Sequence, residues 1–332
     1  MRFILAALAV LLASGASAQT FEMKLAASLV GDPNVAWLTE FKNRIEAKTN
    51  GRIAAKVFPG GQLGSPADIV SGLQLGTIEM YSIPPGFLKG VAAPFEVVEA
   101  PGLFGSHDQA HRIVTDPAFR DGYLRLAEAK GMLGIAIWVY GPSGAYVTRS
   151  PIKQLADFRG MKIGVRATKV ETEILERLGG VGVPVNWPEA VPSIQAKVTD
   201  GQRSSLVTLA ASKFYSVAKY ATILDDSWAI IGEFVSTKFM AKLPADLRQT
   251  VLDIGRAMEP FGTETGKSFN AKAEQIWKEN GGEVLRFAPD EGAKALKLVA
   301  PVGDQYLGAN DNPETRKFYG ILKQLAAKSR AS

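Results

Sequence analysis

Two side chains suited to holding an organic anion follow strands that are predicted in the middle of the chain. Residues 151–202 are predicted to form a βαβ unit, with its first strand over 161–165. Ligands of such units sit beyond the carboxyl ends of the strands, where Arg166, Ala167 and Trp187 fall. A guanidinium beside an indole favours the capture of an anion that has an apolar body.

Each of the two has a purely structural alternative. Arg166 is also consistent with a solvated arginine, or with one that bridges two parts of the fold. Trp187 is also consistent with a core residue that plugs the end of a strand. The sequence alone leaves both alternatives open.

Patterns typical of enzymes are incomplete in this chain. His107 and His111 share a helix face in HDQAH, but Asp replaces the Glu of the zinc-protease motif and no other histidine exists. Residues 141–144, GPSG, lack the spacing of a nucleophile elbow. The glycines at 60–61 are not followed by the Lys-Ser of a phosphate-binding loop and indicate a turn. We therefore expect no enzyme activity, no cofactor and no metal.

Strands and helices alternate along the first hundred residues. Asp32 before Pro33 opens one predicted helix, and Ser65 before Pro66 caps another that ends at Gly76. The pattern is typical of an α/β protein. Strands are predicted over 21–29, 52–58 and 78–83, with helices between Asp32 and Asn50 and between Ser65 and Gly76.

Two further helices have clear signals. Thr168 and Glu171 have the spacing of a capping box, which predicts a helix that begins there. Residues 244–277 are predicted to be one long helical stretch, with a kink or break at Pro260 because proline cannot donate the backbone hydrogen bond.

The first eighteen residues have the features of a secretory signal peptide. A basic Arg2 precedes the apolar run 3–12, which is too short to span a bilayer, and Ala16-Ser17-Ala18 provides small residues for cleavage. The mature chain is expected to start at Gln19. Because the sequence contains no cysteine, neither a lipid anchor on cysteine nor a disulfide framework is available, and we expect a free protein in the periplasm.

The length and the charge of the chain limit its domain organisation and its possible partners. The roughly 310 residues after the leader exceed what one hydrophobic core comfortably serves, which predicts two lobes. The net charge of +5 is spread along the chain without a block of like charges. Nucleic acid and membrane surfaces are therefore not expected as partners.

The succession of segments resembles the substrate-binding proteins of TRAP transporters, the DctP family. The resemblance covers nearly the whole mature chain. Its motifs are FPGGQLGSPADIVSGLQLGTIEM at 58–80, LADFRGMKIGV at 155–165, TDGQ at 199–202, SKFYSVAKY at 212–220 and KLPADLRQTV at 242–251.

This resemblance implies a type II periplasmic-binding-protein-like fold. Two α/β lobes joined by a hinge would close on the solute between them, with one long helix spanning both. It also implies the membrane subunits of a TRAP transporter as partners, and a monomer is expected. The implied division is 1–18 for the signal peptide, 19–141 plus 230–269 for lobe 1, and 142–229 plus 270–332 for lobe 2.

One departure from the family pattern concerns the ligand's carboxylate. Family members usually hold it with an arginine in the strand after the RGMKI-type segment, and the aligned residue here is Gly164. We expect the clamp to move to Arg166, two residues on and on the same face of a continuing strand. Arg203 is a second candidate, at a position where relatives carry an acidic or amide residue, and Asp226 could pair with it. An unpaired surface role for Arg203 stays open.

The remaining candidates also come from the resemblance. Trp187 corresponds to the aromatic ring that lies against the ligand's body. Few polar groups align with the pocket, which favours a monocarboxylate with an apolar or aromatic body. The alternatives are a binding protein that serves a sensor, or a ligand that is not a carboxylate because of Gly164. The other predicted ligand-binding residues are Ser28, Tyr140, Ser204 and Trp228.

Overall fold

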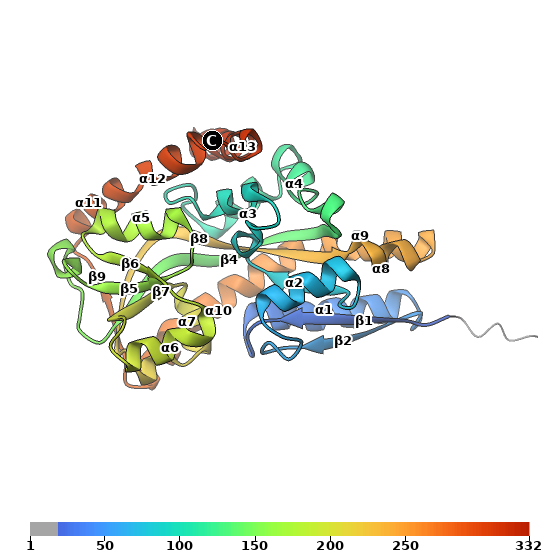
Figure 1. Cartoon of the computed structure of the whole chain (residues 1–332), viewed down its shortest axis with the longest axis horizontal. Helices are drawn as coiled ribbons and strands as arrows, with labels where there is room; N and C mark the ends of the chain where they lie inside the picture. The colour runs from blue at the N-terminus through green and yellow to red at the C-terminus, as the bar shows by residue number, and fades with distance from the viewer. Residues whose placement is uncertain (1–18, 332) are drawn as a thin grey trace, which may run out of the picture.

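The computed structural model describes residues 19–331, and the predicted signal peptide lies outside this range. Within the described residues no helix is long and apolar enough to cross a membrane. Figure 1 shows helices on both sides of a sheet, with the C-terminal helices along one edge of the molecule. The α/β fold predicted from the sequence is confirmed.

Nine strands of the described residues form one sheet in the order β2-β1-β3-β8-β4-β7-β5-β6, with β9 paired to β8. We call β2, β1 and β3 the first half of the sheet, and β7, β5 and β6 the second half. Within each half neighbouring strands are parallel. The strands are β1 Phe21–Ala27, β2 Ile53–Phe58, β3 Met80–Ile83, β4 Met132–Thr148, β5 Lys162–Val165, β6 Val181–Pro184, β7 Gly201–Ser204, β8 Tyr220–Ser236 and β9 Glu283–Arg286.

Two 17-residue strands, β4 and β8, join the halves as an antiparallel pair. Their register shifts between Gly134 and Ala136, between Val139 and Gly141, and between Ser143 and Ala145. Such bulges bend and twist a strand, so the pair changes direction where it passes from one half to the other. The GPSG segment at 141–144 therefore lies inside a strand.

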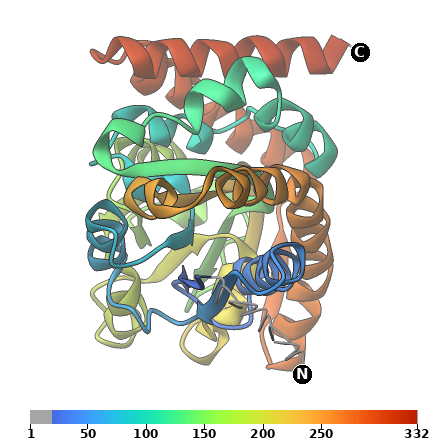
Figure 2. The same cartoon turned by 90° about the vertical axis from the view of Figure 1, so that its right-hand side faces the viewer.

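The helices of the first three-quarters of the chain cover both faces of the sheet (Figures 1 and 2). Short 3-10 helices connect several of them. The α-helices are α1 Pro33–Lys48, α2 Pro66–Leu75, α3 His107–Val114, α4 Pro117–Tyr123, α5 Lys169–Leu178, α6 Trp187–Gln195, α7 Leu206–Ala211, α8 Thr237–Lys242 and α9 Ala245–Ala257, and the 3-10 helices include η1 Pro85–Leu88 and η2 Ala93–Glu99.

The predicted long helical stretch is present and broken. It forms α9 and then α10, Glu259–Glu279, with the break at Met258 and Pro260 in the first turn of α10. Proline fits a first turn because that turn has no intrahelical partner for its N–H. Helix α10 packs on α1 of the first half and on α7 of the second, as the resemblance implied.

The C-terminal helices also contact both sides of the molecule. Helix α11, Pro289–Val299, packs on α5, whereas α13, Pro313–Ala331, packs on η2, α3 and α4. Between them lie α12, Pro301–Gly303, and a short π-helical turn, Asp304–Gly308. The lobe boundaries given above stay a prediction.

The predicted helix caps are largely present. Asp32 caps α1 by accepting from the Val35 N–H at 3.2 Å. Ser65 caps α2 in a reciprocal box with Asp68. Thr168 caps α5 by accepting from the Glu171 N–H, but the Glu171 carboxylate does not return to the cap and instead contacts two arginines.

Two hydrophobic cores lie on opposite faces of the sheet. Consecutive residues of β4 alternate between them, with Ile137 and Val139 in one core and Trp138 and Tyr140 in the other. This alternation follows from the two-residue period of a strand. The long strands therefore contribute side chains to both cores. They also pair with the short strands β3 and β7, and polar residues lie near the ends of these short strands.

Candidate functional site

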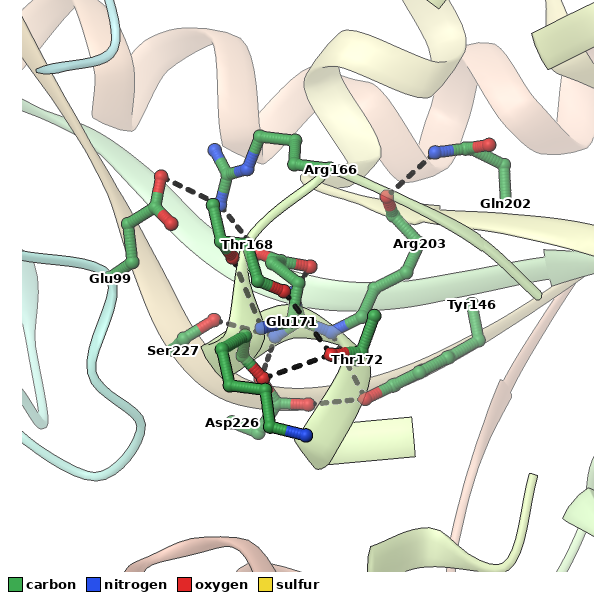
Figure 3. Close-up of polar contacts among 11 residues, drawn as sticks. Glu99, Tyr146, Arg166, Thr168, Glu171, Thr172, Gln202, Arg203, Asp226 and Ser227 are labelled. Atoms are coloured by element: carbon green, nitrogen blue, oxygen red, sulfur yellow. Dashed lines mark hydrogen bonds and ion pairs between the residues drawn. The ribbon is translucent and has the colours of Figure 1, made fainter. Parts of the chain in front are cut away.

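A buried arginine organises the second half of the sheet. Arg203 lies in β7 and its side chain is 1% exposed. Its Nη1 donates to Glu171 Oε2 at 2.6 Å, its Nη2 donates to Ser227 Oγ at 2.7 Å and pairs with Asp226, and its Nε donates to the Tyr146 hydroxyl at 3.1 Å (Figure 3). We call Arg203, these four partners, Arg166 and Glu99 the arginine cluster.

The predicted pair of Arg203 and Asp226 is confirmed, and Tyr146 reinforces it. The Tyr146 hydroxyl donates to Asp226 Oδ2 at 2.5 Å, and the Arg203 guanidinium lies 5.7 Å from the centre of the tyrosine ring. Burial and the nearby Asp226 carboxylate raise the pKa of Tyr146 well above its usual value. The tyrosine therefore stays a hydrogen-bond donor, and most donors of Arg203 are already used within the protein.

Arg166 lies at the open side of the same cluster. Its Nη2 contacts Glu171 Oε1 at 2.5 Å and Glu99 Oε1 at 3.3 Å, and its side chain is 28% exposed. In Figure 3 the other terminal nitrogen of Arg166 points away from both carboxylates. Strand β5 ends at Val165, because the chain turns as the Thr168 N–H donates to the Arg166 carbonyl at 2.7 Å. The expectation of a strand that continues through Arg166 is therefore wrong.

Glu171 is the residue whose role sequence reasoning missed. Its carboxylate bridges Arg166 and Arg203 from the first turn of α5. Burial alone would raise the pKa of Glu171, but the two guanidinium groups hold it below the usual value. Its spacing from Thr168 gave a capping signal, and nothing in the local pattern separated a cap from an ion pair.

Glu99 reaches the cluster from the last residue of η2. Its side chain is 5% exposed, and neither carboxylate oxygen has a hydrogen-bond partner among the described residues. Its polar contact is the ion pair with Arg166. Burial raises the pKa of Glu99 to about 7, although Arg166 acts to lower it. A Cβ on Gly86 would lie 1.7 Å from Glu99 Oε1, so this carboxylate needs a glycine beside it.

Gly164 has a direct structural consequence. A Cβ at this position would lie 2.1 Å from Oε1 of Gln202, whose Nε2 donates to the Arg203 carbonyl at 3.3 Å. The Gln202 amide thus occupies the space into which a side chain at position 164 would project. An arginine here would require the glutamine to move.

A second polar cluster lies at the ends of the first-half strands. Asp32, which follows β1, accepts from the Tyr140 hydroxyl at 3.5 Å, and the Tyr140 hydroxyl accepts from Thr208 of α7 at 3.3 Å. Burial raises the pKa of Asp32 to about 6, although its hydrogen bonds act to lower it. Tyr140 therefore connects the first half to α7, which follows β7.

Glu233 of β8 extends this second cluster. Its Oε1 accepts from Ser82 Oγ at 2.8 Å and from the Trp138 indole at 2.9 Å, and Oε2 has no hydrogen-bond partner. Burial raises the pKa of Glu233 well above its usual value. We call Asp32, Tyr140, Thr208, Ser82 and Glu233 the acid–hydroxyl cluster.

The other predicted ligand-binding residues lie around these clusters. Ser28 Oγ is 2.5 Å from the Tyr81 hydroxyl, and Ser204 is half-buried at the end of β7. Trp187 opens α6 and packs on Phe214, with ring centres 5.2 Å apart. The structure brings Arg166, Arg203 and Asp226 together, and it joins Tyr140 to Asp32.

Trp228 and the two histidines have structural contacts. The Trp228 indole donates to the Phe104 carbonyl at 2.9 Å, and its ring meets His107 edge-on. His111 Nδ1 lies 3.0 Å from Thr263 Oγ1. Within residues 19–331 no group of histidine and acidic side chains is placed to hold a metal ion. The ligand-binding role of Trp228 stays a prediction.

An α/β sheet with polar clusters at its strand ends is the arrangement expected of a protein that binds a small solute. A model of the family described as bacterial extracellular solute-binding protein, family 7, DctP, matches residues 29–309. The chain belongs to this family, the solute-binding proteins of TRAP transporters. It is 27% identical over 271 residues to the C4-dicarboxylate-binding periplasmic protein DctP of Rhodobacter capsulatus, covering 80% of each chain.

Solved structures agree with this assignment. A TRAP periplasmic solute-binding protein from Ochrobactrum anthropi, with its C-terminus bound in the ligand-binding pocket, has a TM-score of 0.80 and 27% identity, covering 94% of this chain and 97% of that chain. A protein from Desulfovibrio salexigens with bound orotic acid has a TM-score of 0.86 and 21% identity, covering 93% and 100%. The type II fold implied by the resemblance is confirmed.

Proposed function

We propose that this protein captures a small organic acid in the periplasm and delivers it to the membrane subunits of a TRAP transporter. Family membership supports the transport role. The expected location rests on the signal-peptide pattern at the start of the chain. Closure of the two lobes around the acid would give the membrane subunits a shape to recognise, because binding shifts the population toward the closed form.

The observation that supports an acid as the solute is the position of Arg166. It lies just beyond β5, its side chain is partly exposed, and both of its ion pairs use the same nitrogen, Nη2. The guanidinium therefore has further donors to offer a carboxylate. Arg203 is a positioning residue in this proposal, because it is buried and holds Glu171, which in turn holds Arg166.

The solute's body is proposed to be apolar or aromatic. Trp187 supports this, since it is half-buried beside the strand ends and offers part of an indole surface. Related structures contain acids of several kinds, among them orotic acid, succinate and galacturonate. The Ochrobactrum structure has a C-terminus bound in the ligand-binding pocket, and a chain terminus also ends in a carboxylate.

A second candidate is a solute that is not a carboxylate. By the resemblance, Gly164 stands where the family usually has an arginine. Most donors of Arg203 are already used by carboxylates and hydroxyls of the protein itself. A screen that includes amines and neutral heterocycles separates the two candidates. Stabilisation by these compounds and by no acid would favour the second.

The test of the first candidate begins with thermal-shift measurements on orotate, succinate, galacturonate and phenylacetate. A solute at 100 times its dissociation constant stabilises a protein by about 2.7 kcal/mol. We expect Arg166→Ala to weaken binding of the best acid at least tenfold, since a lost charge-assisted contact costs roughly 1.5–3 kcal/mol. Calorimetry measures this affinity.

The matched control is Arg125→Ala. Arg125 is an exposed arginine with its own carboxylate partner, Glu128, and it lies outside both polar clusters. We expect this variant to bind the acid as the unmodified protein does. Equal affinity of the Arg166→Ala variant would refute the role of Arg166 in holding the carboxylate.

A further inference from the structure

Glu99 is a poorly compensated carboxylate beside the proposed binding group. It is buried, its two oxygens lack hydrogen bonds, and Oε1 lies 3.3 Å from Arg166 Nη2. Most buried carboxylates in proteins are paired and hydrogen-bonded, because the unmet desolvation cost is large. The lack of hydrogen bonds at both oxygens therefore needs an explanation.

The net charge of the arginine cluster also disfavours an ionised Glu99. Arg166 and Arg203 already face two carboxylates, Glu171 and Asp226, before Glu99 is considered. A charged Glu99 makes the cluster negative. A solute carboxylate that binds Arg166 would then add another negative charge within a few ångströms of Glu99.

Glu99 also belongs to a contact between the two predicted lobes. Helix η2 falls in predicted lobe 1, and Arg166 falls in predicted lobe 2. Lys89, just after η1, reaches the carbonyl of Ala167 in a second contact of this kind. The Glu99 carboxylate therefore meets, across the two predicted lobes, the guanidinium that is proposed to hold the solute.

We propose that Glu99 is a specificity-determining residue that opposes the solute carboxylate at Arg166, so that an acid binds together with a proton on Glu99. This inference rests on the proposed function. Two carboxylates that share one site do not both ionise readily, because each charge disfavours the other. A protonated Glu99 removes the repulsion and can donate a hydrogen bond.

The sign of the pH dependence follows from the groups around Glu99. With its pKa near 7 in the free protein, Glu99 is partly protonated at neutral pH, and a bound carboxylate would raise that pKa further. Binding then takes up a proton, so affinity falls as pH rises. The charged and titratable groups near Glu99 are Glu96 of η2, Arg166 after β5, Glu171 of α5, Arg203 of β7 and Tyr123 of α4.

Calorimetry with benzoate and orotate, which are both ionised in this range, tests the proposal. We expect the unmodified protein to bind them about tenfold more weakly near pH 8 than near pH 6, which is one decade per proton over the pH unit above the pKa. Titrations in buffers of different ionisation enthalpy should show uptake of up to one proton per acid bound. This measurement needs no variant.

Glu99→Gln should bind the same acids about tenfold more tightly near pH 8, with little proton uptake and a flat pH profile. The matched control is Glu96→Gln, which removes a half-buried carboxylate from the same 3-10 helix without touching Arg166. We expect this control to keep the pH dependence of the unmodified protein.

The possible failures are distinguishable. If the unmodified protein binds an acid through Arg166 but its affinity is independent of pH and equals that of Glu99→Gln, the role of Glu99 is refuted and the proposed function stands. Weaker binding by Glu99→Gln, with an unchanged melting temperature, would also refute it, because Glu99 would then hold the solute. If no acid of the panel binds either protein, both proposals fail.

Discussion

The arginine cluster and the acid–hydroxyl cluster both accommodate buried carboxylates, but the first does so with cations and the second with uncharged donors. Both place buried carboxylates near the carboxyl ends of parallel strands. In the first, Glu171 meets two guanidinium groups and its pKa is lowered in spite of burial. In the second, Asp32 and Glu233 meet only hydroxyl, indole and backbone donors, and burial raises the pKa of both.

The difference shows that the partner, rather than the depth of burial, decides the charge state. An ionised carboxylate in a protein interior needs a cation or several strong donors, and without them it takes up a proton. Glu99 lies between these cases because it has one guanidinium contact and no hydrogen bond. This intermediate position makes it responsive to a further negative charge.

The largest expected effect comes from removing the central cation. Arg203→Met should lower the free energy of unfolding by about 3–5 kcal/mol, because it leaves Glu171 and Asp226 buried with less compensation. Urea unfolding near pH 7 measures this loss. Part of it should be recovered at lower pH, where the stranded carboxylates take up protons.

A surface ion pair provides the control for this experiment. Arg149 pairs with Asp200 at 3.0 Å, and both side chains are about one-third exposed. Arg149→Met should cost at most about 1 kcal/mol, the usual limit for exposed pairs. Similar losses in the two variants would mean that the arginine cluster is not ionic in the way described.

The fold was largely predictable because its signals are local. Helix caps such as Ser65 and the proline at the start of α10 act through neighbouring backbone groups, so their sequence pattern is sufficient. The long strand β4 was not predicted through 141–144, because glycine and proline usually end strands. Here the bulges accommodate them, with Gly141 and Gly144 at positive φ.

The site was predictable only in part because its contacts are distant in sequence. The pairing of Arg203 with Asp226 was predicted from family positions and is confirmed. Glu171 was assigned to a cap because of its spacing from Thr168, and its contact with Arg203, 32 residues further along the chain, left no local signal. Glu99 gave no signal at all, since it comes from a 3-10 helix far earlier in the chain.

A smaller effect is expected from the acid–hydroxyl cluster, and it depends on pH. The folded-state pKa of Asp32, about 6, lies above the unfolded value of about 3.9, so this group's contribution is full below the unfolded value and is lost as pH rises through 6. The loss should be on the order of 2–3 kcal/mol between about pH 4 and pH 7. Asp32→Asn should remove this component while keeping the cap of α1.

The control for this pH dependence is Asp116→Asn. Asp116 caps α4 in the way that Asp32 caps α1, but it is only half-buried. Unfolding curves of this variant should keep the pH profile of the unmodified protein. If Asp32→Asn also leaves the profile unchanged, Asp32 does not titrate in the way that its burial indicates.

The smallest expected effect is that of Glu233→Gln, and this variant gives the most direct contrast with the arginine cluster. If Glu233 is neutral when folded, Glu233→Gln exchanges one uncharged group for another of the same shape, and the acceptor for Ser82 and Trp138 is kept. We expect a change of less than about 1 kcal/mol in the free energy of unfolding near pH 7. The equivalent change at the ionised Glu171 removes a charge that two arginines share, so it should cost clearly more. Equal losses in the two variants would mean that Glu233 is charged in the folded protein, and the contrast between the clusters would be wrong.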